Sequence, residues 1–293
     1  MFLSSASRGA LAGRHALVAA LWGCGIVSAL VIAAILAFIL GEAVPVLRHV
    51  GATAFVTDAS WHPASGQFNL LPMLAGTVLV SLGAMLIAGP VGFISAIFCQ
   101  FYAPPWIAAS YRRVLYVIVG VPSVVYGLWG LVVLVPLIGS IEPPGASLLA
   151  GMLVLSIMIL PTVAVIADTS LGQVPGHIFR GGLALGVPMH RVVLRIVLPA
   201  ARAGLFTALV LAAGRALGET MAVLMVTGNA VQMPASLFDP IRSLAANIAL
   251  EMSYAMGDHR SALFVSGVIL TAIVAAATVL ADRLSPAETH HED

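Results

Sequence analysis

Two charged residues, Arg215 and Glu219, stand alone in an otherwise apolar stretch of the sequence. A charge at the centre of a lipid bilayer costs about 2.5–3.5 kcal/mol on insertion scales, so these residues need a compensating role. Their spacing of four residues predicts that both lie on one helix face, where each could partly neutralise the other. We consider two interpretations: a structural ion pair that faces another helix, and a contact with an anionic substrate at a water-filled interface.

The second interpretation suits an anion. Arg215 has a planar set of hydrogen-bond donors and stays protonated when buried, as binding of a buried anion requires. Glu219 would keep Arg215 from holding the anion too tightly, so we expect Arg215 to exchange between Glu219 and the anion. Thr220 and Asn247 could add neutral hydrogen bonds, although core packing or helix capping explains each of them about as well.

Other kinds of chemistry find little support in the sequence. All 13 basic residues are arginine, which excludes a lysine Schiff base and a phosphate-binding loop that ends in Lys. Cys24 and Cys99 lie within apolar runs, and neither His177 nor His190 has a partner at metal-ligand spacing. We therefore expect no metal site and no disulfide framework. The net charge of +1 indicates no nucleic-acid partner.

The composition is that of a membrane protein. Of the 293 residues, 60% are hydrophobic and 9% are charged, whereas a soluble domain has about 45–50% and about 25%. A bilayer core about 30 Å thick takes about 20 apolar residues as a helix. The apolar runs are continuous rather than alternating, which favours helices over a barrel. They predict six transmembrane helices, near residues 16–40, 73–98, 114–138, 147–167, 203–227 and 261–281.

The arginines predict how the chain is oriented. Nine of them lie on alternate connections that include both ends of the chain, and three lie on the opposite side. Because cytoplasmic connections are enriched in basic residues, both termini are expected in the cytoplasm. The first span could be read as a signal peptide. Its apolar run is far longer than the usual run of about 7–15 residues, which favours an uncleaved helix.

The outer connection between the fifth and sixth spans contains a predicted helix near residues 240–256. Asp239 could cap this helix and Gly257 could end it. The segment is either a surface lid or a receiver of substrate, and the sequence favours neither. Arg242 and Glu251 are expected to be solvated residues of that lid.

The inner connection between the fourth and fifth spans, residues 170–202, contains an amphipathic helical pattern that begins at Pro188. The apolar residues Met189, Val192, Val193, Ile196 and Val197 share one face, and His190, Arg191 and Arg195 share the other. Such a helix could lie on anionic lipid or present a face to a cytoplasmic partner, and its periodicity does not distinguish the two. Asp168, just before this connection, is expected to be an interfacial charge rather than a proton relay.

A motif in this connection resembles one found in permeases of binding-protein-dependent ABC transporters. That motif reads E-A-A, three residues, Gly, nine residues and then I-x-L-P. Here Gly186 is followed, after nine residues, by Ile196, Val197, Leu198 and Pro199, while Arg180, Gly181 and Gly182 replace E-A-A. The resemblance implies that residues 176–200 form the coupling loop that docks into the ATPase subunit, with the charge reversed at the first position.

Further segments resemble the permeases of phosphate transporters, and the PstC-type subunit more closely than its PstA-type partner. They are residues 70–77, 120–130, 214–222, 236–240, 246–249 and 259–264. The resemblance covers about residues 69–281 and implies one permease domain there. Residues 1–68 would form a cytoplasmic tail, the first helix and an outer loop, and residues 282–293 a second cytoplasmic tail.

The resemblance implies an all-α polytopic protein with the type I ABC importer permease fold, in the bacterial inner membrane. It would transport inorganic phosphate and would not itself be an enzyme. The implied partners are a PstA-type permease, an ATPase dimer, a periplasmic phosphate-binding protein and membrane lipid. ATP and Mg²⁺ would be bound by the ATPase, and this chain would hold no cofactor. Two alternatives stay open: another oxyanion, such as phosphonate, molybdate or sulfate, or a subunit that signals external phosphate.

Overall fold

A computed structural model describes the backbone of residues 4–284 and the side chains of residues 17–281 and 283. Most of the predicted C-terminal tail lies outside this range. The long helices are α1 (Ser4–His49), α3 (Leu71–Ile97), α7 (Leu148–Gly172) and α14 (Gly257–Leu284). The shorter helices of the body are α4 (Pro105–Val119), α5 (Ser123–Trp129), α6 (Val135–Gly139), α11 (Arg202–Leu217) and α12 (Met221–Val226).

Smaller elements lie at the two ends of these helices. The outer loops contain α2 (Ala54–Thr57), a hairpin of β1 (Trp61–His62) and β2 (Gln67–Phe68), a short 3₁₀ turn (Pro63–Ser65) and α13 (Leu244–Glu251). The inner connection contains α8 (Gly176–Ala184), α9 (Met189–Val192) and α10 (Leu198–Ala200). Three π-helical turns, Phe98–Tyr102, Gly130–Leu134 and Val193–Val197, interrupt or extend the helices.

Among the described residues, four helices are long and apolar enough to cross a membrane: Leu17–His49, Leu71–Tyr102, Leu148–Gly172 and Gly257–Ala281. Two bent pairs bring the number to six if each pair counts as one span. They are Pro105–Val119 with Ser123–Gly139, and Met189–Ala200 with Arg202–Leu217. The predicted all-α polytopic fold is confirmed, although two of the expected spans are not continuous helices.

The breaks have local causes. The predicted span 114–138 bends by 93° between α4 and α5, where Pro122 lacks a backbone donor and restricts the residue before it. The predicted helix over 203–227 ends at Leu217 and resumes as α12 at Met221. Gly218, a poor helix former, lies between them. The expectation of a single helix over 203–227 is therefore wrong.

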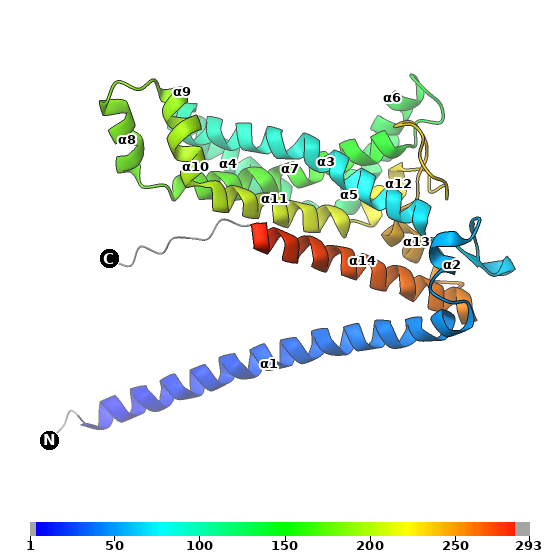
Figure 1. The fold of residues 1–293 in the computed structure, drawn as a ribbon. Helices are drawn as coiled ribbons and strands as arrows, with labels where there is room; N and C mark the ends of the chain where they lie inside the picture. Colours follow the sequence, from blue (N-terminus) through cyan, green and yellow to red (C-terminus); the bar gives the residue numbers. More distant parts are fainter. Residues whose placement is uncertain (1–3, 285–293) are drawn as a thin grey trace.

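The core of the body forms where α3, α7 and α11 pack together (Figure 1). Small buried residues on α3 and α11 let these helices approach α7 closely, as is usual in membrane proteins. They are Ala84, Ala88, Ala212 and Ala216, and they pack in one cluster with Leu155 and Ile159 of α7. This packing fixes the position of α11, which carries Arg215.

Helix α1 diverges from the body and meets it only near its C-terminal end (Figure 1). Phe38 packs edge-on against Phe264 of α14, with ring centroids 5.7 Å apart. Ala43 and Val46 are buried in the cluster that also includes Leu263. By contrast, the large apolar side chains of α1 between residues 17 and 36 are exposed.

In the outer segment 228–251, residues 241–251 fold into the body, whereas none of residues 228–240 is buried. Leu244 is buried, and its backbone N–H donates to Thr77 Oγ1 of α3 at 2.9 Å. The predicted helix is present but short, and Ser243 caps it by accepting from Ala246 N at 3.1 Å. Asp239 is not the cap, because its carboxylate accepts from two preceding backbone N–H groups. Gly257 begins α14 and does not end α13.

Candidate functional site

Arg215 and Glu219 do not form the predicted pair. Arg215 lies in the last turn of α11, and the helix ends at Leu217, so Glu219 is no longer at helical spacing from it. Glu219 Oε1 instead accepts a hydrogen bond from Ala222 N at 3.0 Å and so holds the start of α12. The salt bridges of the described side chains involve neither residue. The structure therefore does not support exchange of Arg215 away from Glu219.

Arg215 is half-buried and faces α7. Its Nη1 donates to Thr162 Oγ1 at 3.2 Å. Thr162 follows Pro161, which is buried inside α7. Sequence reasoning missed Thr162, because one threonine in an apolar span gives no spacing signal. The guanidinium has five N–H donors, and within the described residues its side-chain bond goes to a neutral hydroxyl, so no carboxylate cancels its charge.

Thr220 and Asn247 lie in different surroundings. Thr220 sits in the break between α11 and α12, half-buried, and its hydroxyl donates to Gly218 O at 3.4 Å. Asn247 is fully buried on α13, and its Oδ1 accepts from Arg242 Nη1 at 3.0 Å. The structure keeps Thr220 beside the α11 break that follows Arg215, but it joins Asn247 to a separate cluster.

That cluster, the outer network, consists of Trp61, Arg242, Asn247, Glu251 and His259. Arg242 Nη1 donates to Glu251 Oε1 at 2.6 Å. Glu251 Oε2 accepts from Trp61 Nε1 at 2.9 Å and lies 2.8 Å from His259 Nε2. The side chains of Arg242 and Glu251 are only 18% and 10% exposed. The expectation that these two residues are solvated is wrong, because residues 241–251 fold into the body.

The inner connection has the predicted amphipathic pattern. Val192, Val193 and Val197 are buried, while His190, Arg191 and Arg195 are exposed. The helical stretch is not uniform, because residues Val193–Val197 form a π-helical turn between α9 and α10. At the tip, Leu185 is 84% exposed. The apolar face is therefore used inside the protein, and the basic face and the tip are open to a partner or to lipid.

Two glycines in the motif shape this connection. Gly186 has φ +75°, a conformation that side chains rarely adopt, and it turns the chain from α8 to α9. Gly182 is buried where α8 crosses α9, because a Cβ at this position would lie 3.0 Å from Val192 Cγ2 and 3.3 Å from Ile196 Cδ1. Arg180 and Gly181 are exposed. Leu198 is half-buried and Pro199 exposed at the end of the connection.

Comparison with known proteins decides the family. Residues 88–289 match the family described as "Binding-protein-dependent transport system inner membrane component". This chain belongs to that family. The permease is similar to the probable ABC transporter permease protein YqgH of Bacillus subtilis, with 39% identity over 70% of this chain and 68% of the relative. It is also similar to the phosphate transport system permease protein PstC of Haemophilus influenzae, with 32% identity over 86% of each chain.

Solved structures support the same fold. A chain of a bacterial alginate ABC transporter, with 14% identity, aligns over 93% of the permease and 95% of its own length with a TM-score of 0.67. A chain of the MetNI methionine ABC transporter in an inward-facing conformation, with 20% identity, aligns over 74% and 92% with a TM-score of 0.56. The permease is thus a multi-pass inner-membrane subunit that works with ATPase and binding-protein partners. Such subunits are not enzymes, since the ATPase is a separate chain.

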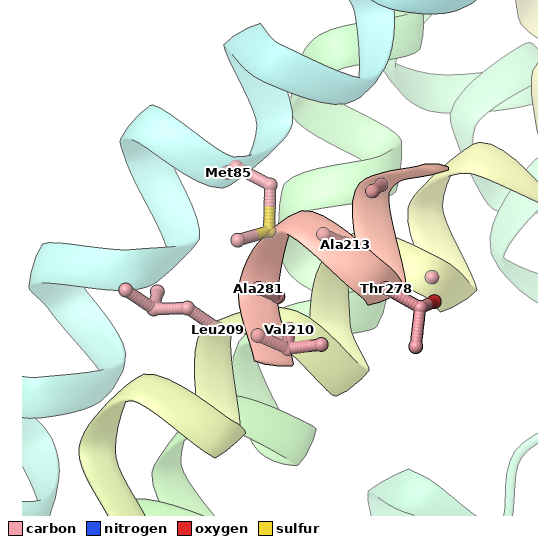
Figure 2. A pocket seen from close by; sticks show the side chains of 8 residues that line it. Met85, Leu209, Val210, Ala213, Thr278 and Ala281 are labelled. Carbon is pink, nitrogen blue, oxygen red and sulfur yellow. The ribbon is translucent and has the colours of Figure 1, made fainter. Parts of the chain in front are cut away.

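A groove with a volume of about 160 Å³ opens between α3, α11 and α14 of the permease. Figure 2 shows Met85, Leu209, Val210, Ala213, Thr278 and Ala281 around it. Thr278 is its one polar lining side chain within the described residues, so the groove offers no charge to an anion. No group of three or more His, Cys, Asp and Glu residues within residues 17–281 could hold a metal ion. Arg215 is therefore the stronger candidate for substrate contact.

The outer network should contribute strongly to stability. Glu251→Ala would leave Arg242 buried without its counter-charge, which typically costs about 3–5 kcal/mol. We expect a clearly lower thermal unfolding midpoint of the detergent-purified transporter complex, followed by intrinsic fluorescence. Glu142→Ala is the matched control, because Glu142 is exposed. Equal midpoints for the two variants would contradict a stabilising role of the network.

Gly182 and Gly181 provide a matched test of the coupling loop. Gly182→Val would push α8 away from Val192 and Ile196, whereas a Cβ at Gly181 meets nothing within 4 Å. Both changes carry the same cost in helix propensity. We expect Gly182→Val to lower the amount of ATPase subunit that co-purifies with the permease severalfold, while Gly181→Val retains most of it. Similar losses in both variants would show that the α8–α9 crossing is not the determinant.

Proposed function

We propose that this permease is the PstC-type subunit of an ATP-driven importer of inorganic phosphate. The sequence relatives support the cargo, since PstC proteins from several bacteria are 32–35% identical over most of the chain. The single observation that carries the proposal is the state of Arg215. It is a half-buried cation in the body of the protein whose side-chain partner is the neutral Thr162 hydroxyl.

An unneutralised guanidinium in this place favours an anion. A phosphate that crosses a region of low dielectric needs a compensating positive charge. Arginine matches phosphate oxygens with paired N–H donors, and the Thr162 hydroxyl can add one further hydrogen bond. The bond to Thr162 is weaker than an ion pair would be, so phosphate can displace it at little cost. Thr220 carries the neutral polar side chain of the break and is our candidate for a second neutral contact.

Glu219 has a positioning role in this proposal. By accepting from Ala222 N, it orients α12 directly after the break that follows Arg215. Its charge would also oppose an anion that moves along the break, which favours release over tight retention. Asn247, in contrast, belongs to the outer network, and its role is to position Arg242 rather than to bind phosphate.

The proposal includes the assembly. The second permease is a PstA-type subunit, and the binding protein delivers phosphate from the periplasm. Arg180, Gly186 and the exposed tip of the coupling loop face the ATPase dimer, which binds ATP and Mg²⁺, while this chain holds no cofactor. We place both termini in the cytoplasm. In support, the start of α1 and the end of α14 lie toward the same side of the molecule as α8 and α9, opposite α2 and α13 (Figure 1).

Replacement of Arg215 tests the proposal. Arg215→Gln should lower uptake of labelled phosphate about tenfold or more in a strain that otherwise lacks this chain, because a hydrogen bond to a charged group is worth about 1.5–3 kcal/mol. Arg202→Gln, at the exposed start of the same helix, should keep most of the uptake. Immunoblots of membranes control for assembly.

Three results would count against parts of this assignment. Normal uptake with assembled Arg215→Gln would remove Arg215 from the path. Competition by excess sulfate, molybdate or phosphonate would change the cargo. Uptake that does not depend on the wild-type chain, although the chain assembles, would favour a signalling role over transport.

Glu219 allows charge and capping to be separated. Glu219→Gln keeps a side-chain oxygen that can accept from Ala222 N, whereas Glu219→Ala removes the cap, a loss of about 0.5–2 kcal/mol. We expect phosphate uptake to fall several times further in Glu219→Ala than in Glu219→Gln. If both variants lost uptake equally, the charge of Glu219 and not its capping bond would be the essential property.

A further inference from the structure

The end of α3, the middle of α4 and the end of α7 meet the coupling loop at a polar and aromatic cluster, the inner joint. It consists of Gln100 and Phe101 of the π-helical turn after α3, Arg112 of α4, Asp168 of α7 and Phe179 of α8. Neither the coupling-loop motif nor the candidate phosphate contacts include Gln100, Arg112 or Asp168. The cluster therefore needs an account of its own.

Arg112 links three helices through charge-assisted bonds. Its Nε and Nη2 donate to the two carboxylate oxygens of Asp168 at 2.7 and 2.9 Å. The same Nη2 donates to Gln100 Oε1 at 2.7 Å. A bidentate arginine–carboxylate pair fixes geometry as well as energy. Asp168 is 13% exposed and Arg112 is 36% exposed, so the pair is better shielded than an ordinary surface salt bridge.

The π-helical turn connects this ion pair with the coupling loop. Gln100 reaches Arg112, and the next residue, Phe101, packs against Phe179 of α8 with ring centroids 5.1 Å apart. Phe98–Tyr102 is the π-helical turn that carries both residues. Such wide turns are rare and occur frequently at functional sites. A shift of α8 would therefore displace Phe101 and also the adjacent Gln100, which is hydrogen-bonded to Arg112.

The Phe101–Phe179 contact with α8 can change its geometry, whereas the Arg112–Asp168 ion pair cannot. A cavity with a volume of about 290 Å³ lies beside the rings and is lined by Gln100, Phe101, Gly172 and Phe179, among others. Because the Phe101–Phe179 contact contains no hydrogen bond, α8 can shift into this space without breaking one. The Arg112–Asp168 pair cannot slide in the same way, so α4 and α7 would follow as one unit.

Helix α4 then leads toward the candidate phosphate path. It ends at the 93° bend that joins it to α5. Tyr126 of α5 packs in the same apolar cluster as Ala222 of α12. Glu219, in the break that follows Arg215, accepts a hydrogen bond from Ala222 N of α12. This series of contacts therefore leads from the coupling loop to the break that follows Arg215.

We propose that the inner joint transmits movement of the coupling loop to the phosphate path, with Gln100 and Arg112 as positioning residues. This inference rests on the proposed function, because it assigns a mechanical link within the importer. The joint makes no contact with substrate or nucleotide. Loss of the joint should therefore uncouple ATP hydrolysis from transport, while the permease and the ATPase still bind each other.

The test uses the complete transporter, with both permeases, the ATPase dimer and the phosphate-binding protein, in proteoliposomes. The measured quantity is phosphate transported per ATP hydrolysed. Gln100→Ala cuts the link to the π-helical turn but leaves the Arg112–Asp168 pair in place, and Arg112→Gln breaks both. We expect each variant to lower the ratio at least fivefold. Arg113→Gln, at an exposed position on the same helix, should stay within twofold of wild type.

A charge swap adds a test of rescue. Arg112→Asp combined with Asp168→Arg restores an ion pair, and the Gln100 amide can then donate to the new carboxylate. This double variant should recover the ratio to within about threefold of wild type, which a role in folding alone would not require. The swap therefore tests the interaction and not the identity of either side chain.

Defined outcomes would overturn the proposal. An unchanged ratio in assembled Gln100→Ala and Arg112→Gln would reject it, and so would failure of both variants to assemble, since the joint would then be structural only. If the wild-type complex moved no phosphate, the proposed cargo would fail instead. The joint would then be judged by the stimulation of ATP hydrolysis by the binding protein, which both variants should lose and Arg113→Gln should keep.

Discussion

Each polar backbone group that leaves a helix within the membrane has to be satisfied by the protein itself, because lipid supplies no hydrogen bonds. This constraint explains where the polar side chains of the permease are placed. At the break after α11, Glu219 Oε1 accepts from Ala222 N in the first turn of α12. Where the chain turns back after α12, Asn229 Nδ2 donates to Leu224 O at 2.8 Å, and Arg242 Nε donates to Asn229 O at 2.9 Å. The irregular segments are stable because side chains form hydrogen bonds with the backbone groups that have no helical partner.

The same constraint fixes the electrostatics of the candidate site. Three carboxylates are already engaged, since Glu219 caps a helix, Glu251 neutralises Arg242 and Asp168 holds Arg112. Arg215 is left with a threonine hydroxyl. A buried cation without a counter-charge is unfavourable on its own, and it becomes favourable when an anion arrives. In the proposed function, the engagement of these carboxylates elsewhere is what would make Arg215 a suitable binding group.

Hydropathy predicted the four long spans, and the six expected spans are reached if each bent pair counts as one. Helical periodicity predicted the amphipathic face of the inner connection. They did not predict the breaks, since Gly and Pro are common within membrane helices and do not by themselves indicate a bend such as that at Pro122. Arg242 and Glu251 were misread because a polar outer segment looks the same in sequence whether it is solvated or folded into a buried network. The prediction of an Arg215–Glu219 pair was wrong for a related reason. Residues four apart share a face only while the helix continues, and α11 ends at Leu217.

The two ends of the permease differ in how easily they can rearrange. At the outer end, the network around Glu251 joins β1, α13 and α14, and breaking a buried charge pair is costly. At the inner end, α8 touches the body through aromatic rings beside a cavity. Movement that starts at the coupling loop would therefore be taken up between these ends. The hinges available there are the bend between α4 and α5 and the break between α11 and α12, and the second directly adjoins Arg215. Under the proposed function, opening and closing would take place around Arg215 while the outer block moves as a unit.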